Sequence, residues 1–126
     1  MRRSFLSQSA SAARSAFFAL SARAMRQIVV DHLRRRIAAK RGGDAAPLPL
    51  EEQLVPARER DEQILGLDDA LTLLGERDPR LARVVECKFF GGMEYEEIAK
   101  VVGTSPRTVR RDWLKAKAWL ANAMEA

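Results

Sequence analysis

Apolar residues recur every three or four positions in the first third of the chain, which is the spacing of one face of an α-helix. The stripe that they form is Phe18, Ala22, Met25, Val29 and Leu33. The arginines that lie on a different side of the same segment are Arg23, Arg26, Arg34 and Arg41. The pattern therefore predicts one long helix with an apolar back and a cationic front. A solvated face and a phosphate-binding face are equally compatible with these arginines.

Helix-breaking residues interrupt this pattern. Two glycines and two prolines stand within residues 42–49, and these residue types are the strongest local breakers of helices. Pro56 and the charged run at residues 58–62 extend the interruption, because neither a proline nor solvated charges supply a buried face. The sequence predicts three parts, which are a helix within residues 1–41, a linker over residues 42–60 and a folded domain over residues 61–126.

The folded domain shows helical spacing throughout, and no stretch in it alternates with the period of two that is typical of β-strands. Its first helix carries Ile64, Leu67, Leu71 and Leu74. Asp78 and Pro79 are an N-cap and a proline at the first helical position, so they open a second helix. The residues that the second helix is expected to bury are Leu81, Val84, Val85 and Phe89. We therefore predict an all-α fold, with four helices in this domain.

The last two helices have the layout of a helix-turn-helix. The apolar residues of the first of them are Tyr95, Ile98, Ala99 and Val102, at i, i+3, i+4 and i+7. Gly103 then provides the turn, and Ser105 followed by Pro106 opens the final helix. The apolar stripe of the final helix is Val109, Trp113, Ala116, Leu120 and Met124. The pattern alone is also compatible with a plain helical hairpin that carries a solvated basic face.

The position of the basic residues favours DNA binding. Arg107, Arg110 and Arg111 lie in the first two turns after Ser105, which is the part of a recognition helix that enters the major groove. Guanidinium groups there can form two hydrogen bonds to guanine or bind phosphates. Asp112 could orient Arg111 or accept a hydrogen bond from a cytosine amino group, and of these roles we expect an ion pair within its own helix. For Trp113 we expect a role in core packing.

Charge is distributed unevenly along the 126 residues, which carry a net charge of +5. Residues 1–42 have a surplus of nine positive charges, residues 43–92 a surplus of five negative charges, and residues 93–126 a surplus of one positive charge. Two basic ends on either side of an acidic middle indicate a polyanionic partner that is contacted at two places.

Enzyme, metal and membrane interpretations find little support in the sequence. His32 is the single histidine and Cys87 the single cysteine, so we expect a surface or packing histidine, a buried cysteine, no catalytic centre, no metal and no cofactor. No apolar run approaches the roughly 20 residues that span a bilayer.

Residues 61–126 resemble the carboxy-terminal DNA-binding domain, region four, of bacterial extracytoplasmic-function (ECF) sigma factors. The similarity includes the stretch EYEEIAKVVGTSPRTVRRDWLKAKAWL. The amino-terminal stretch AFFALSARAMRQIVVDHLRRRIAAKRGG is similar to the last helix of region two, which helps to recognise and melt the downstream promoter element. The resemblance implies promoter recognition, docking on the flap of the RNA polymerase β subunit, an anti-sigma factor as a further partner, and a bacterial cytoplasmic location without membrane contact.

The resemblance also assigns residues to DNA. The candidates for the upstream promoter element are Ser105, Arg107, Thr108, Arg110, Arg111 and Lys115. The candidates for a secondary contact by the region-two helix are Arg23, Arg26, Arg34 and Arg41. Thr104 stands where the family has an apolar residue, a departure that we expect to leave the turn undisturbed. A complete member has further region-two helices, among them one that clamps the β-prime subunit, and we expect this chain to start too late to contain them.

Three other interpretations remain open at this point. The composition of residues 1–30, rich in Arg, Ser and Ala and free of acids, also matches a mitochondrial transit peptide. A stand-alone helix-turn-helix regulator would bind DNA without polymerase. A protein-interaction module would use the acidic middle of the chain to hold a partner.

Overall fold

The computed structural model describes the backbone of residues 2–42 and 51–125, and the side chains of residues 9–39 and 57–125. All regular structure in these ranges is helical. The helices are α1 (Arg2–Gly42), α2 (Glu51–Arg77), α3 (Pro79–Val85), the π-helical turn η1 (Glu86–Phe90), α4 (Tyr95–Val102) and α5 (Pro106–Glu125). The predicted all-α fold class is confirmed.

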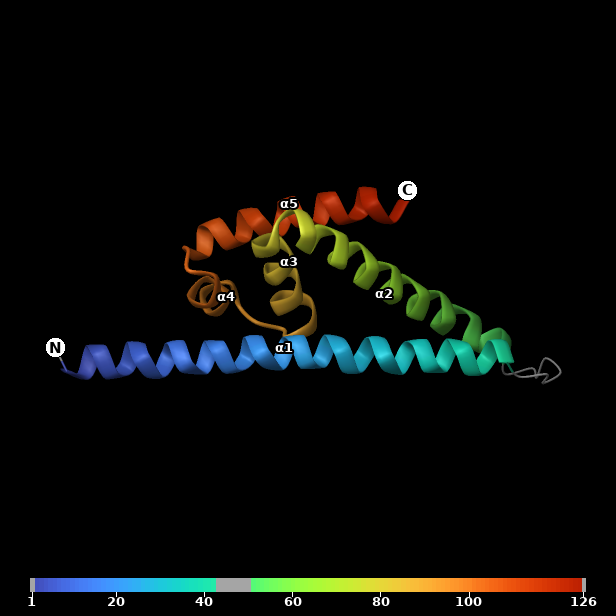
Figure 1. Cartoon of the computed structure of the whole chain (residues 1–126), viewed down its shortest axis with the longest axis horizontal. Helices are drawn as coiled ribbons and strands as arrows, with labels where there is room; N and C mark the ends of the chain where they lie inside the picture. The colour runs from blue at the N-terminus through green and yellow to red at the C-terminus, as the bar shows by residue number, and fades with distance from the viewer. Residues whose placement is uncertain (1, 43–50, 126) are drawn as a thin grey trace.

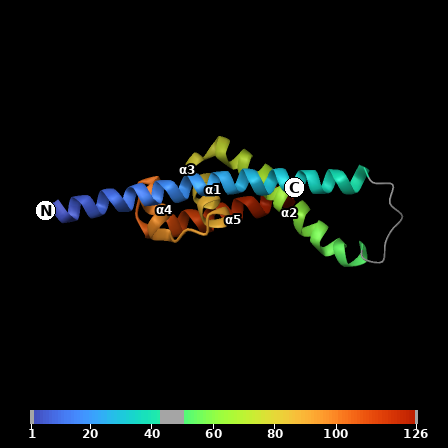
Figure 2. The same ribbon diagram turned by 90° about the horizontal axis from the view of Figure 1, so that it is seen from below.

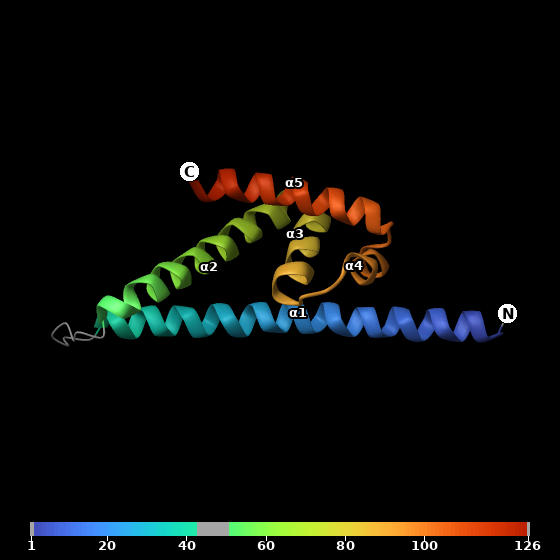
Figure 3. The ribbon, with the colours of Figure 1, turned by 180° about the vertical axis from the view of Figure 1, so that it is seen from behind.

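Helix α1 lies along one side of the molecule, and the remaining helices all lie on its other side (Figures 1 and 3). The elements α3, η1 and α4 fill the space between α1 and α5, while α2 crosses from the end of α1 towards α5 (Figure 1). The view from below shows the other helices behind α1, which runs across their face (Figure 2). The basic amino-terminal segment is therefore packed against the acidic middle of the chain.

Two clusters of buried side chains hold this arrangement together. The first cluster joins α1 to α3, η1, α4 and α5 through Ala19, Val84, Cys87, Met93, Ile98, Ala99 and Val109. The second joins α2, α3 and α5 through Ala70, Leu71, Leu74, Leu81, Val85, Ala116 and Leu120. Trp113 packs against both clusters, so its predicted role in core packing is confirmed. Because α5 contributes to both clusters, its orientation is fixed relative to every other described helix.

Helix α2 begins ten residues earlier than the first helix expected for residues 61–126. Residues 51–60, predicted as part of the linker, are helical and include Pro56. Their role as a linker between two parts of the chain stays a prediction. Charged residues are good helix formers when they pair along one face, and Arg58 Nε lies 3.4 Å from Glu62 Oε1 one turn later. Residues 43–50 of the predicted linker lie outside the described residues.

The packed face of α1 differs from the predicted apolar stripe. Ala22 and Leu33 of that stripe are buried, but Met25 is exposed. The residues that make up the packed face are Ser15, Ala19, Ala22, Arg26, Val30, Leu33 and Ile37. Arg26 lies on this face because acidic side chains of α2 and η1 receive it. The predicted separation of an apolar back from a cationic front therefore fails at Arg26.

The second predicted helix begins as expected and then changes its winding. The Asp78 carboxylate accepts a hydrogen bond from the Leu81 N–H at 3.2 Å, which confirms the predicted N-cap. After Val85 the chain continues as the π-helical turn η1, and a π turn holds more residues than an α turn. The following side chains are therefore rotated, so Glu86 and Cys87 are buried whereas Phe89 is exposed. The predicted burial of Phe89 was wrong.

Close packing against α1 requires a glycine at the end of this turn. A Cβ atom on Gly91 would lie 2.7 Å from the Ala22 Cβ and 2.7 Å from the Cys87 carbonyl oxygen. Atoms of these types do not approach so closely, and the carbonyl belongs to the backbone and cannot swing away. The missing side chain of Gly91 thus allows the loop after η1 to lie directly on α1.

Candidate nucleic-acid interface

Helices α4 and α5 are joined by a three-residue turn at Gly103, Thr104 and Ser105. Gly103 has φ 75° and ψ 38°, a left-handed conformation that glycine adopts without steric cost. The N–H groups of Gly103 and Thr104 donate to the Ala99 carbonyl at 2.9 and 3.1 Å. The predicted turn at Gly103 is confirmed, and Thr104 leaves it undisturbed.

Helix α5 starts at the predicted position. The Ser105 hydroxyl accepts a hydrogen bond from the Thr108 N–H at 3.2 Å and donates to Thr108 Oγ1 at 3.0 Å. Pro106 follows as the first helical residue, where its lack of an N–H costs no hydrogen bond. Ser105 thereby fixes the start of α5, and the contact of Ser105 and Thr108 with DNA stays a prediction.

The two sides of α5 differ completely in character. The buried residues of this helix are Val109, Asp112, Ala116 and Leu120. The exposed basic residues on the opposite side are Arg107, Arg110, Arg111 and Lys115, which we call the basic face. Within the described part of the chain, no acid lies within ion-pair distance of the basic face. These four cations are therefore available to an external anion.

Asp112 of α5 lies among these arginines in the sequence, but its carboxylate is held away from the basic face by Arg80 of α3. Arg80 Nε lies 2.9 Å from Asp112 Oδ2, and Arg80 Nη2 donates to Oδ1 at 3.2 Å. The Asp112 side chain is only 8% exposed. The predicted ion pair of Asp112 within its own helix was therefore wrong. The pair with Arg80 ties α5 to α3 and keeps negative charge away from the basic face.

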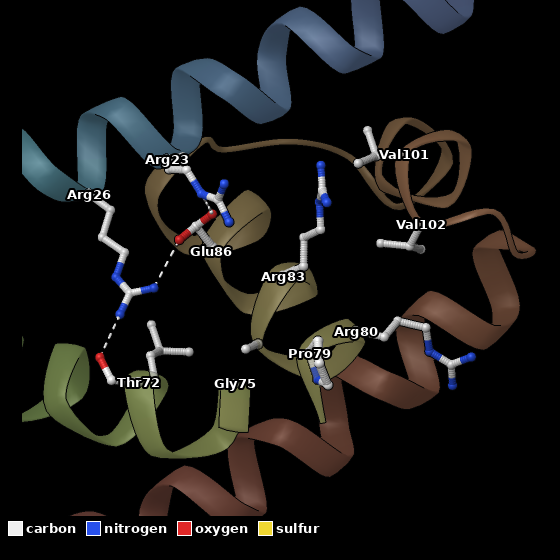
Figure 4. Close-up of a pocket in the computed structure, with 12 residues that line it drawn as sticks. Arg23, Arg26, Thr72, Gly75, Pro79, Arg80, Arg83, Glu86, Val101 and Val102 are labelled. Carbon is white, nitrogen blue, oxygen red and sulfur yellow. Dashed lines mark hydrogen bonds and ion pairs between the residues drawn. The ribbon is translucent and has the colours of Figure 1, made fainter. Parts of the chain in front are cut away.

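Arg26 of α1 is paired with two internal acids. Arg26 Nε donates to Asp68 Oδ1 at 2.7 Å. Arg26 Nη1 donates to Glu86 Oε2 at 2.9 Å (Figure 4). Burial disfavours its charge, but the hydrogen bonds and charges of both acids outweigh this effect and raise the pKa of Arg26. Arg26 is thus committed to the fold.

The other candidates for a secondary contact are less deeply engaged. Arg23 Nε lies 3.7 Å from Glu86 Oε1, and Arg34 Nη2 lies 3.4 Å from Asp68 Oδ2. Both arginine side chains are largely exposed, so a phosphate could replace these weak partners. The side chain of Arg41 lies outside the described residues. DNA contact by the α1 arginines stays a prediction.

A hollow of about 570 Å³ lies beside the Arg26 ion pairs, between α1, α2, α3 and α4 (Figure 4). Its basic lining includes Arg80 and Arg83, neither of which the sequence analysis singled out. Figure 4 shows Arg83 extending between Glu86 and Val101. The lining comes from α1, α2, α3, η1 and α4, and only the packing of α1 and α4 against the middle of the chain brings these residues together.

Cys87 is buried in the first core cluster. Burial, reinforced by the negative charge of Glu86, raises the pKa of the Cys87 thiol to about 11. A raised pKa disfavours the thiolate, which is the nucleophilic form. The predicted buried cysteine is confirmed.

The thiol of Cys87 is expected to react slowly with a disulfide reagent such as DTNB at pH 8. A pKa raised from 9.0 to about 11 reduces the thiolate fraction about 100-fold at this pH, and burial blocks access further. A Gln63→Cys, Cys87→Ser variant, with its thiol on the exposed surface of α2, is the control. Equal rates for the two folded proteins would contradict the assignment.

Other chemistry-bearing groups form no centre in the described residues. Within these ranges no group of three or more His, Cys, Asp or Glu side chains could hold a metal ion. His32 is exposed on α1. None of the described helices is both long and apolar enough to cross a membrane.

Comparison with known proteins identifies the family. The family model described as ECF sigma factor matches residues 7–126, a range that includes α2 to α5 and nearly all of α1. Searches of the curated proteins and of the solved structures find no match. The matched range contains both basic segments and the whole of the α4–α5 pair. The chain therefore belongs to the ECF sigma factor family, whose members bind DNA and act in transcription initiation.

Proposed function

We propose that this chain directs bacterial RNA polymerase to promoters in the cytoplasm by reading the upstream promoter element with α5. Helices α4 and α5 act together as a helix-turn-helix, with α5 as the recognition helix. The observation that carries the proposal is the basic face, Arg107, Arg110, Arg111 and Lys115, which is exposed and opposite the buried side of α5. Family membership supports the same assignment.

The energetics of the basic face favour an anionic groove. Its cations have no internal ion pair to break within the described residues, so neutralising DNA phosphates releases counterions without a compensating loss in the protein. Arg107 and Arg110 lie in the first two turns of α5, the part of a recognition helix that reaches base edges. Ser105 and Thr108 add hydroxyl groups at the same end, suited to phosphate contacts.

The proposal includes further partners, and in it the chain itself catalyses no reaction. The helices around α5 would dock on the β flap of core polymerase, and an anti-sigma factor would regulate the chain. Arg23, Arg34 and Arg41 would supply the secondary contacts near the melted region of the promoter. Arg26 is omitted from these contacts because its guanidinium is held by Asp68 and Glu86.

Replacing Arg110 by alanine is expected to weaken promoter binding by about 1–3 kcal/mol if the guanidinium binds a base edge. The loss should be largest for the preferred sequence, because bidentate arginine contacts distinguish guanine from other bases. Fluorescence anisotropy with duplexes selected from a random library measures both the affinity and the preference. Arg60→Ala, an exposed arginine on α2, is the matched control and should leave both unchanged.

The outcomes of this experiment separate two roles for the basic face. A loss that is equal for all sequences, with a salt dependence reduced by about one unit, would indicate a phosphate contact. Unchanged binding by the Arg110→Ala, Arg111→Ala double variant would contradict the proposed function.

A stand-alone regulator is the second candidate, favoured by the way α2, α3 and α4 support α5 within the chain itself. A gel-shift assay with and without core polymerase distinguishes the two candidates. Specific binding that requires polymerase supports the sigma function, whereas specific binding by the chain alone supports the regulator. Polymerase or anti-sigma binding without DNA binding would indicate an interaction module.

A further inference from the structure

The outer face of α1 carries an exposed apolar stripe. Phe17, Leu20 and Ile28 are 65%, 64% and 63% exposed, and Met25 beside them is 47% exposed. Together with Ala24, positions 17, 20, 24 and 28 advance by three, four and four residues, which places them along one line of the helix. Large exposed apolar patches are rare on monomeric proteins and mark surfaces that are covered by a partner.

No described part of the chain covers this stripe. Helices α2 to α5 lie on the other side of α1 (Figures 1 and 3), where they bury Ala19, Ala22 and Val30. At 100° per residue, the direction of Phe17, Leu20 and Ala24 is opposite to that of these buried residues. Helix α1 is therefore apolar on two opposite sides, and one of them is open.

We propose that a second copy of this chain covers the stripe, with the two α1 helices packed antiparallel. The limits of the stripe define the register, because both ends are buried only when Phe17 of one copy lies opposite Ile28 of the other. Leu20 then lies opposite Met25, and Ser21 opposite Ala24. The small Ser21 and Ala24 at the centre allow the helix axes to approach to about 8–10 Å.

Charge complementarity supports this register independently. Asp31 is the single acid among residues 1–42, and in the same register it lies opposite Arg14 of the other copy, twice per dimer. The other arginines of residues 10–35 are Arg23, Arg26, Arg34 and Arg35, and the residues opposite them are Ala22, Ala19, Ser11 and Ala10. A parallel pairing in register would instead place every arginine beside the same arginine of the other copy, where like charges repel.

The present contacts of Arg14 and Asp31 leave both free to pair. Arg14 lies over the Phe18 ring at 5.6 Å, and the Asp31 carboxylate accepts a hydrogen bond from Gln27. Neither has an ion pair in the described part of the chain. Helix α5 lies on the far side of the molecule from the stripe (Figure 1), so pairing through α1 leaves the basic face of each copy open.

Sedimentation velocity of the full chain over a range of concentrations tests the proposal. The chain should dimerise, and Leu20→Glu combined with Ile28→Glu should raise the dissociation constant by about tenfold or more, because each dimer then buries four carboxylates in an apolar contact. Leu73→Glu, at a side chain on α2 that is 55% exposed, is the matched control and should not change it. Circular dichroism verifies that each variant remains folded.

A charge exchange tests the register. Arg14→Asp alone should weaken the dimer, because the new carboxylate would then face Asp31 of the other copy, and Arg14→Asp combined with Asp31→Arg should restore it. A monomer at all concentrations up to about 100 μM, far above most specific dissociation constants, would overturn the proposal. So would a dimer weakened equally by Leu73→Glu, or one that the charge exchange fails to restore. A monomer whose Leu20→Glu, Ile28→Glu variant loses polymerase binding would assign the stripe to polymerase and overturn self-pairing.

Discussion

Replacing Arg26 by methionine is expected to lower the free energy of unfolding by about 3–5 kcal/mol. The Arg26 guanidinium contacts Asp68 and Glu86, whose side chains are only 12% and 10% exposed. Methionine has a similar length but no charge, so both carboxylates would remain in a poorly hydrated contact without their common partner. Urea unfolding followed by circular dichroism measures the loss, which should appear as a lower midpoint.

Two further variants test the cause of this loss. Arg35→Met is the matched control, since Arg35 is an exposed arginine of α1 whose side chain, among the described residues, bonds only to the Asp31 carbonyl. The effect of this change should stay within about 0.5 kcal/mol. Adding Asp68→Asn and Glu86→Gln to Arg26→Met should recover much of the stability, because the uncompensated charges are then gone. If Arg26→Met and Arg35→Met have equal effects, the assigned role of Arg26 is incorrect.

Replacing Ile98 by alanine is expected to cost about 2–5 kcal/mol of stability. Ile98 is fully buried in the first core cluster together with Val84 and Val109, so truncation leaves a cavity between α3, α4 and α5. Because α4 helps to orient α5, the affinity of the folded protein for DNA should fall as well. Thermal unfolding measures the first effect, and anisotropy at a temperature where the variant is folded measures the second.

Leu114→Ala is the control for this prediction. Leu114 is 56% exposed on α5, so its truncation should change the free energy of unfolding by no more than about 0.5 kcal/mol. Equal losses of stability for Ile98→Ala and Leu114→Ala would show that the core does not depend on the α3–α4–α5 contact. A stable Ile98→Ala variant with unchanged DNA affinity would contradict the role of α4 in orienting α5.

The features that the sequence predicts correctly depend on neighbouring residues. The Asp78 cap, the left-handed Gly103 and the Ser105 cap each form hydrogen bonds within five residues. Such contacts are nearly independent of the rest of the fold. For the same reason the exposed basic face of α5 follows from helical periodicity once its start at Pro106 is known.

The features that sequence reasoning missed depend on distant partners. Arg26 resembles any other arginine of α1 until Asp68 and Glu86, 42 and 60 residues away, are brought beside it. Asp112 likewise has possible partners in its own helix, and only the packing of α3 on α5 selects Arg80. Periodicity within one helix contains no information about such pairs. The sequence therefore placed Arg26 on a cationic face and paired Asp112 within its own helix.

The π-helical turn η1 has a consequence for insertions and deletions in the chain. Relative to an α-helix, a π turn is equivalent to one inserted residue. Five π residues, at about 4.4 residues per turn, cover about 410°, which is nearly the angle of about 400° that four α-helical residues cover. Deleting one residue between Glu86 and Phe90 would therefore restore α-helical winding with little rotation of the residues that follow, and Gly91 would stay beside Ala22. The turn can thus lose one residue without moving the glycine that permits close contact with α1, whereas a deletion within the α-helical part of α3 would rotate Gly91 away from Ala22 by about 100°.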